Sequence, residues 1–340
     1  MNNKIFLAAT GNSLSRAAFV DGRWQVECYL PGMWINCLTA DPHDPHKVYA
    51  GTQKHGVQVS EDSGKTWRSL GLEDVPVKSL TISVHQPGLF YAGGKPVSLY
   101  VSQDAGLTWA ELPGLRSSQK WWWFSPADPP GWKPYVQALT VSPGDSNVIM
   151  AGIELGGVLR SEDGGQTWSK HRRGAILDCH SLTFHQTNGN WVYQGGAGRK
   201  SAAALSQDGG LTWRQPGRGL KGKYGWMVAA DPGRPEVWYL SSGNHPNMMR
   251  GEFDPPAHVD GRANAHIYRS VGGAAWEQLD GGLPNPLDFM PYALITDPAV
   301  SGHLYAGLSN GDVWFSADYG DTWLQLPFNL GGIHRTMILI

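Results

Sequence analysis

The chain has 340 residues, a formal net charge of −2 at pH 7, 44 glycines, 23 prolines and 16 tryptophans. A net charge this close to zero offers no general attraction to nucleic acid or to an anionic membrane, and no apolar run is long enough to span a bilayer. We therefore expect no nucleic-acid partner and no membrane span. The many glycines and prolines favour a chain with many turns.

From the N-terminus, three short apolar runs predict the first strands, at residues 4–9, 15–19 and 24–29. These runs are too short for helices, and the first is also too short for the core of a signal peptide. At the opposite end, residues 333–340 form a further apolar run with no partner strand nearby in the sequence. We expect this last strand to join the first three in one sheet, because the pairing would remove exposed sheet edges.

An eight-residue phrase of the form Ser-x-Asp-x-Gly-x-Thr-Trp occurs five times between these ends. The full copies end at Trp67, Trp109, Trp168, Trp213 and Trp323, and two incomplete copies end at Trp24 and Trp276. The seven tryptophans are 43, 42, 59, 45, 63 and 47 residues apart along the chain. Spacings in the forties, combined with short strands, are typical of the blades of a β-propeller.

The residue types of the phrase suit a tight turn between two strands. An aspartate side chain can accept hydrogen bonds from unpaired backbone N–H groups of the turn, and glycine permits a positive φ. The tryptophan can bury a large apolar surface between neighbouring sheets. We therefore interpret these aspartates as residues that hold turns together and not as catalytic groups.

A second repeat precedes the phrase and is clearest at residues 39–51 and 296–307. It consists of an apolar strand, an Asp-Pro turn and a second strand that ends at glycine. Together, the two repeats predict four strands per blade, ordered from the inside to the outside. With residues 333–340 completing the first blade, residues 1–340 are predicted to form one domain, an all-β propeller of seven blades.

The eight-residue phrase resembles the Asp-box, or BNR repeat, of sialidases, xyloglucan-degrading hydrolases, sortilin-type receptors and photosystem II assembly factors. The photosystem II assembly factors are single rings of seven blades and about this size, so they are the most similar in architecture. Xyloglucan hydrolases bind their substrate between two seven-bladed propellers, whereas this chain supplies one. The resemblance therefore implies the blades and leaves the function open.

Propeller geometry predicts where a ligand would bind. The Asp-Pro turns and the Asp-boxes should lie on one face, while the loops at the starts of the inner strands should lie on the other, around the central channel. The long segments 111–136 and 241–266 also fall on that second face, where loops often carry function. The side chains expected to line the channel mouth and bind a ligand are Trp34, Lys78, Lys95, Tyr135, His180, Lys200, Trp226, Tyr292, His334 and Arg335.

This predicted lining combines aromatic rings with cations, which suits an anionic or polyhydroxy ligand or a protein partner. We therefore expect a binding or scaffold propeller. The alternative is a glycoside hydrolase or lyase acting on a glycan-like substrate, because Glu154 and Asp178 come from nearby blades. Glycosidases need two carboxyl groups about 5 Å or about 6.5–9.5 Å apart.

Other readings of the acids remain. Asp128, Asp254 and Asp288 are alternative loop acids for catalysis, and Glu154 and Asp178 could instead pair with nearby cations such as Lys78, Lys200 or Arg335.

We expect no cofactor and no metal site. Residues 195–201 fail the spacing of a phosphate-binding loop, and the pair His43 and His46 falls in an Asp-Pro turn on the face opposite the channel mouth. Cys28, Cys37 and Cys179 are odd in number and lack zinc-type spacing, which predicts reduced thiols and a cytoplasmic location. The sequence leaves open a signal segment removed ahead of Met1.

Overall fold

The computed structural model describes residues 4–123, 125, 133–244 and 256–340. Within them the regular secondary structure is β-strand, apart from the short helix α1 (Pro113–Ser117) and the 3-10 turn η2 (Pro256–His258). No helix of this part of the chain is long and apolar enough to cross a membrane. The alternative loop acids Asp128 and Asp254 lie outside the described residues.

The first three sheets each contain four antiparallel strands. The first has the order β26 (Met337–Leu339), β1 (Ile5–Ala9), β2 (Leu14–Val20), β3 (Arg23–Tyr29). The second contains β4 (Ile35–Ala40), β5 (Val48–Thr52), β6 (Val57–Ser60) and β7 (Arg68–Ser69). The third contains β8 (Val77–Ile82), β9 (Phe90–Gly94), β10 (Ser98–Ser102) and β11 (Ala110–Glu111).

The remaining sheets are less uniform. A three-stranded sheet contains β12 (Val136–Val141), β13 (Ile149–Ile153) and β14 (Gly157–Ser161). A seven-stranded sheet contains β15 (Asp178–Phe184), β16 (Val192–Ala197), β17 (Ala203–Ser206), β18 (Tyr224–Asp231), β19 (Arg234–Gly243), β20 (His266–Val271) and β21 (Glu277–Leu279). The last four strands are β22 (Pro291–Thr296), β23 (Leu304–Leu308), β24 (Asp312–Ser316) and β25 (Leu324–Asn329).

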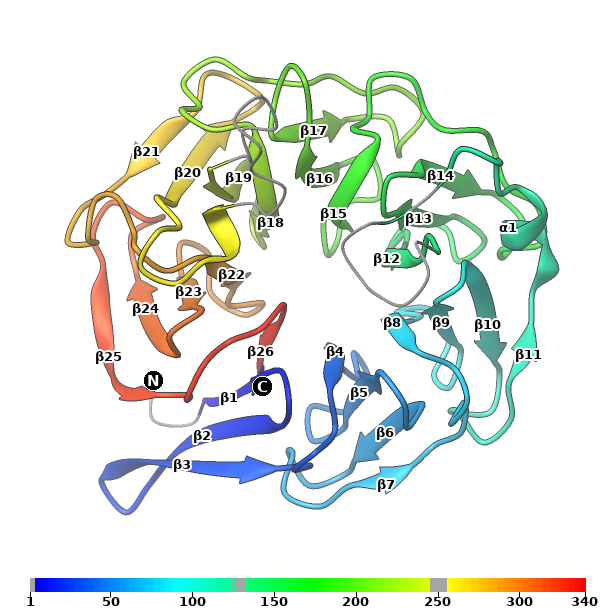
Figure 1. The fold of residues 1–340 in the computed structure, drawn as a ribbon, viewed down its shortest axis with the longest axis horizontal. Helices are drawn as coiled ribbons and strands as arrows, with labels where there is room; N and C mark the ends of the chain where they lie inside the picture. The colour runs from blue at the N-terminus through cyan, green and yellow to red at the C-terminus, as the bar shows by residue number, and fades with distance from the viewer. Residues whose placement is uncertain (1–3, 124, 126–132, 245–255) are drawn as a thin grey trace.

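The sheets are arranged around a common centre, with one strand of each group nearest to it (Figure 1). These inner strands contact one another in the order β26, β4, β8, β12, β15, β18, β22, and β22 contacts β26 again. Within the seven-stranded sheet, β16 and β18 are joined by the single residue pair Ala197 and Tyr224. The sheet consists of two groups of strands, β15–β17 and β18–β21, whose strand pairing is limited to this one residue pair.

The C-terminal strand pairs with the strand that the sequence predicts for it. Leu7 of β1 lies opposite Ile338 of β26, and the backbone groups of Ile5 and Ile340 exchange hydrogen bonds of 2.9 and 3.0 Å. The two chain ends therefore lie in one sheet.

The repeated phrase folds as a turn held by its own side chains. In the copy that begins at Ser161, Asp163 Oδ1 accepts a 2.8 Å hydrogen bond from the backbone N–H of Thr167, and the Thr167 hydroxyl donates to Oδ2 at 2.6 Å. These hydrogen bonds, first that of the Thr167 hydroxyl, lower the pKa of Asp163. The other full copies repeat the pattern at Asp62, Asp104, Asp208 and Asp318. The aspartates act within their turns, as expected.

The sheet of β12–β14 differs from the four-stranded prediction. Outside β14, side chains replace the backbone as hydrogen-bond acceptors: the N–H of Arg160 donates to Ser169 Oγ at 3.0 Å, and the N–H of Val158 donates to His171 Nδ1 at 3.1 Å. The Ser169 and His171 side chains thereby occupy backbone N–H groups of β14 with which a fourth strand would pair. Residues 169–173 therefore follow β14 without forming a regular strand.

Glycines at the ends of the second strands let neighbouring sheets approach closely. A Cβ atom on Gly152 of β13 would lie 2.4 Å from Cys179 Sγ of β15, and one on Gly93 of β9 would lie 2.6 Å from the Cβ of Val136 of β12. Real Cβ atoms do not approach other atoms this closely. Close contact with the neighbouring sheet thus explains why the second predicted strand of the repeat ends with a glycine.

Candidate functional site

The inner strands share a local irregularity close to their starts. In six of them the pairing with the next strand shifts register, and such a β-bulge redirects a side chain. The residues at the shifts are Asn36 in β4, Lys78 in β8, Gln137 in β12, His180 in β15, Trp226 with Met227 in β18, and Tyr292 in β22. The seventh inner strand, β26, is preceded by Arg335, whose φ of +76° is unusual for a residue with a side chain. The redirected side chains come from different sheets and meet near the centre.

A continuous line of ring contacts joins five of the predicted residues. The ring centroids of Trp34 and His334 are 5.4 Å apart, and those of His334 and Tyr292 are 5.9 Å apart. The line continues from Tyr292 to Trp226 at 5.2 Å and from Trp226 to His180 at 5.0 Å. Tyr292, Trp226 and His180 lie in the inner strands β22, β18 and β15, while Trp34 and His334 precede β4 and β26. The five residues form one aromatic arc along the centre of the molecule.

The predicted cations Lys78 and Lys95 lie on a second arc. Both ammonium groups lie over the ring of Tyr135, at 5.3 and 5.6 Å from its centroid, within the range of cation–π attraction. Lys78 is 3 % exposed, and its Nζ donates hydrogen bonds to Gln53 Oε1 at 2.7 Å and Asn36 Oδ1 at 3.3 Å. These two acceptors are neutral side-chain oxygens that orient the ammonium group of Lys78.

Arg335 connects the two arcs. Its Nη1 donates a 3.3 Å hydrogen bond to Oε1 of Gln137, and Nε2 of the same glutamine donates to the backbone carbonyl of His180 at 3.2 Å. Arg335 also affects the neighbouring His334. Partial burial of the imidazole, followed by the charges of Arg335 and Lys78, lowers the pKa of His334 to about 4. Arg335 and Lys78 therefore place positive charge close to His334.

The two acids predicted for the site lie close to His180. The ligand atoms of Glu154, Asp178 and His180 all lie within 4.8 Å of one another. His180 Nδ1 lies 2.7 Å from the carbonyl oxygen of Gly225, and its Nε2 lies 3.5 Å from Asp178 Oδ1. Burial alone would lower the pKa of His180, but the charges of Asp178 and Glu154 outweigh it and raise the pKa to about 9. The two proposed catalytic acids thus share one histidine.

Sequence reasoning missed His258, which adjoins the aromatic arc. Its Nε2 lies 2.6 Å from Tyr224 Oη and its Nδ1 lies 2.6 Å from Tyr292 Oη, while its ring stacks on Tyr292 at 5.7 Å. The only signal in the sequence was its position in the long segment 241–266. A motif gives no indication of this contact, because both tyrosines are 34 positions away.

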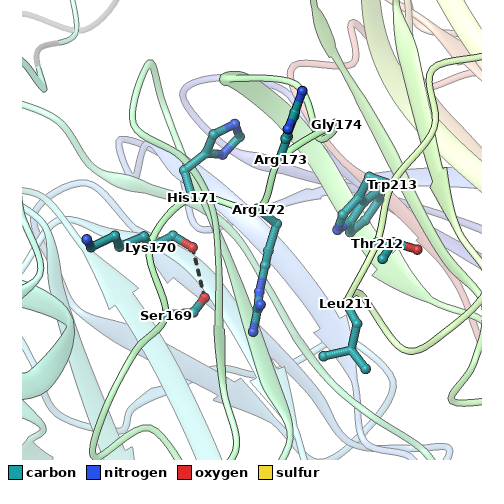
Figure 2. A pocket seen from close by; sticks show the side chains of 9 residues that line it. All are labelled: Ser169, Lys170, His171, Arg172, Arg173, Gly174, Leu211, Thr212 and Trp213. Carbon is teal, nitrogen blue, oxygen red and sulfur yellow. Dashed lines mark hydrogen bonds between the residues drawn. The ribbon is translucent and has the colours of Figure 1, made fainter.

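One predicted residue and one cavity are not among the contacts described above. Lys200, predicted for the channel mouth, is exposed in the turn between β16 and β17 and takes no part in the ring contacts above. A cavity of about 660 Å³ lies between residues 169–174 and 211–213 and is lined by basic side chains, including Lys170, Arg172 and Arg173 (Figure 2). None of the residues that line it belongs to the central arcs.

Comparison with known proteins identifies the fold. The sequence matches no protein-family model and no curated protein sequence. Among solved structures, an ancestral GH74 enzyme aligns with 90 % of this chain and 38 % of its own, at 17 % identity and a TM-score of 0.62. The GH74 xyloglucanase from Xanthomonas campestris aligns with 86 % of this chain and 45 % of its own, at 18 % identity and a TM-score of 0.63.

YCF48 bound to D1 peptide aligns with 86 % of this chain and 81 % of its own, at 15 % identity and a TM-score of 0.56. The chain therefore spans less than half the length of the two GH74 structures and most of the length of YCF48. The predicted resemblance to xyloglucanase propellers and to a photosystem II assembly factor is confirmed. At these identities the comparison establishes a shared all-β, propeller-like fold and no shared activity.

Proposed function

We propose that residues 1–340 form one seven-bladed β-propeller that binds an anionic or polyhydroxy group at the mouth of its central channel. The seven-blade reading is supported by the cycle of inner-strand contacts from β26 through β22 and back to β26. It divides the seven-stranded sheet between β16 and β18, where a single residue pair joins the two halves. The strand β26 would then close the ring.

One observation carries the proposed binding: side chains at or just before the starts of the inner strands gather into a single connected set. That set offers two cations, Lys78 and Arg335, beside the aromatic arc that begins at the half-exposed Trp34. Arginine presents a planar fork to a carboxylate or phosphate, while an aromatic face suits the apolar face of a sugar or a peptide side chain. YCF48 has been captured with a peptide, so a protein segment that carries an acidic group is one candidate partner.

Titration of the purified chain by calorimetry tests this proposal. The probes are citrate and inorganic phosphate for the anion, xyloglucan heptasaccharide for a polyhydroxy ligand, and a short peptide with acidic residues for a protein partner. We expect saturable binding of at least one probe, weakened when Lys78→Gln and Arg335→Ala are combined. Binding that is unchanged in the double variant would place the ligand elsewhere, and no binding of any probe would remove the proposal.

A hydrolase acting on a glycan is the second candidate, favoured by the short separation of the carboxyl groups of Glu154 and Asp178. A separation of about 5 Å is that of a retaining glycosidase, and the xyloglucanase neighbours support a glycan as the substrate class. Release of reducing ends from xyloglucan, lost in both Glu154→Gln and Asp178→Asn, would support this candidate. Prolonged incubation without new reducing ends would exclude xyloglucan hydrolysis.

A further inference from the structure

We propose that Glu154, Asp178 and His180 form a binding site for one divalent transition-metal ion, such as Zn²⁺ or Mn²⁺. This site goes beyond the anion-binding function, because it uses two carboxylates and an imidazole of the centre and takes a cation as ligand. Its three residues come from two neighbouring sheets: Glu154 follows β13, and the other two belong to β15. Glu154 and His180 are 6 % and 7 % exposed.

The hydrogen bonding of His180 prepares its imidazole for a metal. A backbone carbonyl can only accept, so the 2.7 Å contact with Gly225 places a proton on Nδ1. In the neutral ring the lone pair is then on Nε2, the atom that lies 3.5 Å from Asp178 Oδ1. Metal-binding histidines are commonly fixed in this way by a carbonyl on the second nitrogen.

Asp178 supplies an independent observation. Its Oδ1 is shielded from solvent and, among the described residues, receives no hydrogen bond, since the 3.5 Å approach of His180 Nε2 is longer than a normal hydrogen bond. A carboxylate oxygen that is shielded from solvent gains little from so long a contact, so such an atom calls for an explanation. An ion bound between Asp178, Glu154 and His180 would provide one.

The distances are close to those of a metal centre. Ligand atoms about 2.0–2.2 Å from one zinc ion lie about 3.3–3.6 Å from one another in tetrahedral geometry. The present atoms lie within 4.8 Å of one another, so small side-chain rotations would bring them into range. Two carboxylates with one neutral imidazole balance the charge of a divalent ion, and a mixed nitrogen and oxygen set suits zinc or manganese.

The competing arrangement is a protonated His180 held between the two carboxylates, with no metal. The two arrangements differ in whether the protein binds a metal ion from solution. The test uses full-length protein stripped with a chelator and titrated by calorimetry with ZnCl₂ and MnCl₂, with MgCl₂ for comparison. We expect one Zn²⁺ or Mn²⁺ per chain, weak or no binding of Mg²⁺, and absorption bands of a low-symmetry site when Co²⁺ is substituted.

Variants locate the binding. Asp178→Asn and Glu154→Gln, which keep side-chain shape, should each weaken binding at least about tenfold. His303→Gln is the matched control, because His303 Nδ1 also lies 3.5 Å from a buried carboxylate, that of Asp297, but Lys4 takes the place of the second acid. This control should bind metal as the unmodified chain does. Absence of one-to-one binding of Zn²⁺ and Mn²⁺, or equal affinity in Asp178→Asn, would overturn the proposal.

Discussion

The guanidinium of Arg335 donates a 3.3 Å hydrogen bond to the side-chain carbonyl of Gln137, a residue 198 positions earlier in the chain. The contact joins the segment ahead of the C-terminal strand to the bulge of β12. Gln137 in turn contacts the backbone of His180. The segment before the C-terminal strand is therefore part of the central cluster, so changes to that segment should affect both stability and binding.

Substitution of Gly152 by alanine should destabilise the protein. The new Cβ would lie 2.4 Å from Cys179 Sγ, so β13 and β15 would have to separate, at a cost of about 1–3 kcal/mol for overpacking. Urea denaturation measures the change. Gly144→Ala is the control, because the nearest atom to its added Cβ is 3.8 Å away; equal midpoints for the two variants would contradict the close-approach argument.

Removal of one box aspartate should weaken a single turn. Asp163→Ala leaves the N–H and hydroxyl of Thr167 without their acceptor, and we expect unfolding to become easier by about 1–3 kcal/mol while ligand binding stays intact. Gln166→Ala, an exposed position in the same turn, should change little. A well-folded Asp163→Ala protein that has lost binding would refute the structural role assigned to these aspartates.

Loss of the C-terminal strand tests the closure of the ring. Deletion of residues 337–340 removes the pairing of β26 with β1 and the hydrogen bonds between Ile5 and Ile340, and it uncovers the buried face contacted by Met337. We expect a loss of about 3–5 kcal/mol, as for removal of large buried side chains. Thermal unfolding measures the effect: an unchanged melting temperature would contradict the proposed closing role of β26.

Acid should destabilise the fold through His334. Its pKa is lowered to about 4 by partial burial and by the charges of Arg335 and Lys78, so the folded state favours the neutral ring. The stability that the neutral His334 ring contributes is fully present above its unfolded-state pKa of about 6.5. It is lost as the pH falls toward 4, and this loss is on the order of 2 kcal/mol. In urea titrations between pH 7 and pH 4, His334→Gln should show a flatter decline than the unmodified chain. The exposed His55→Gln serves as control, and parallel curves for all three proteins would contradict the assignment.

The sequence predicted best those features that depend on a few neighbouring residues. The box turns are held by contacts among eight consecutive residues, so their repeated spelling was sufficient to predict them. The repeat register also placed His180, Trp226 and Tyr292 at the starts of inner strands. The prediction failed for features that depend on contacts between residues distant in the sequence. The side chains of Ser169 and His171 accept hydrogen bonds from β14 in place of backbone carbonyls, and such contacts leave no periodic pattern in the sequence.

The same limit explains the uneven result at the site. Lys200 and Arg335 were both predicted from their positions at strand ends. Arg335 reaches the centre because its backbone adopts a positive φ, which no pattern in the sequence indicates at a residue other than glycine. His258 was missed because its tyrosine partners come from strands on either side of a long loop. The residue types near the channel were predictable, whereas their mutual contacts required the structure.

Arg335 provides the most direct test of ligand binding. Arg335→Ala should weaken binding of the anion identified among citrate, phosphate and the acidic peptide by about 1.5–3 kcal/mol, through loss of charge-assisted hydrogen bonds. Alanine at this position keeps the strained φ of +76°, so backbone strain is the same in both proteins. We expect Arg335→Lys to bind with intermediate affinity, because lysine supplies the charge without the planar fork.

The control is Arg116→Ala, which removes an exposed arginine paired with Glu111 at 2.8 Å, a kind of surface pair that contributes little. Affinities measured by calorimetry at 50 and 300 mM salt should converge for the unmodified chain and Arg335→Ala as screening increases. If Arg116→Ala weakens binding as much as Arg335→Ala does, the anion responds to overall charge. A loss confined to Arg335→Ala and restored in part by lysine places the anion at the centre of the ring.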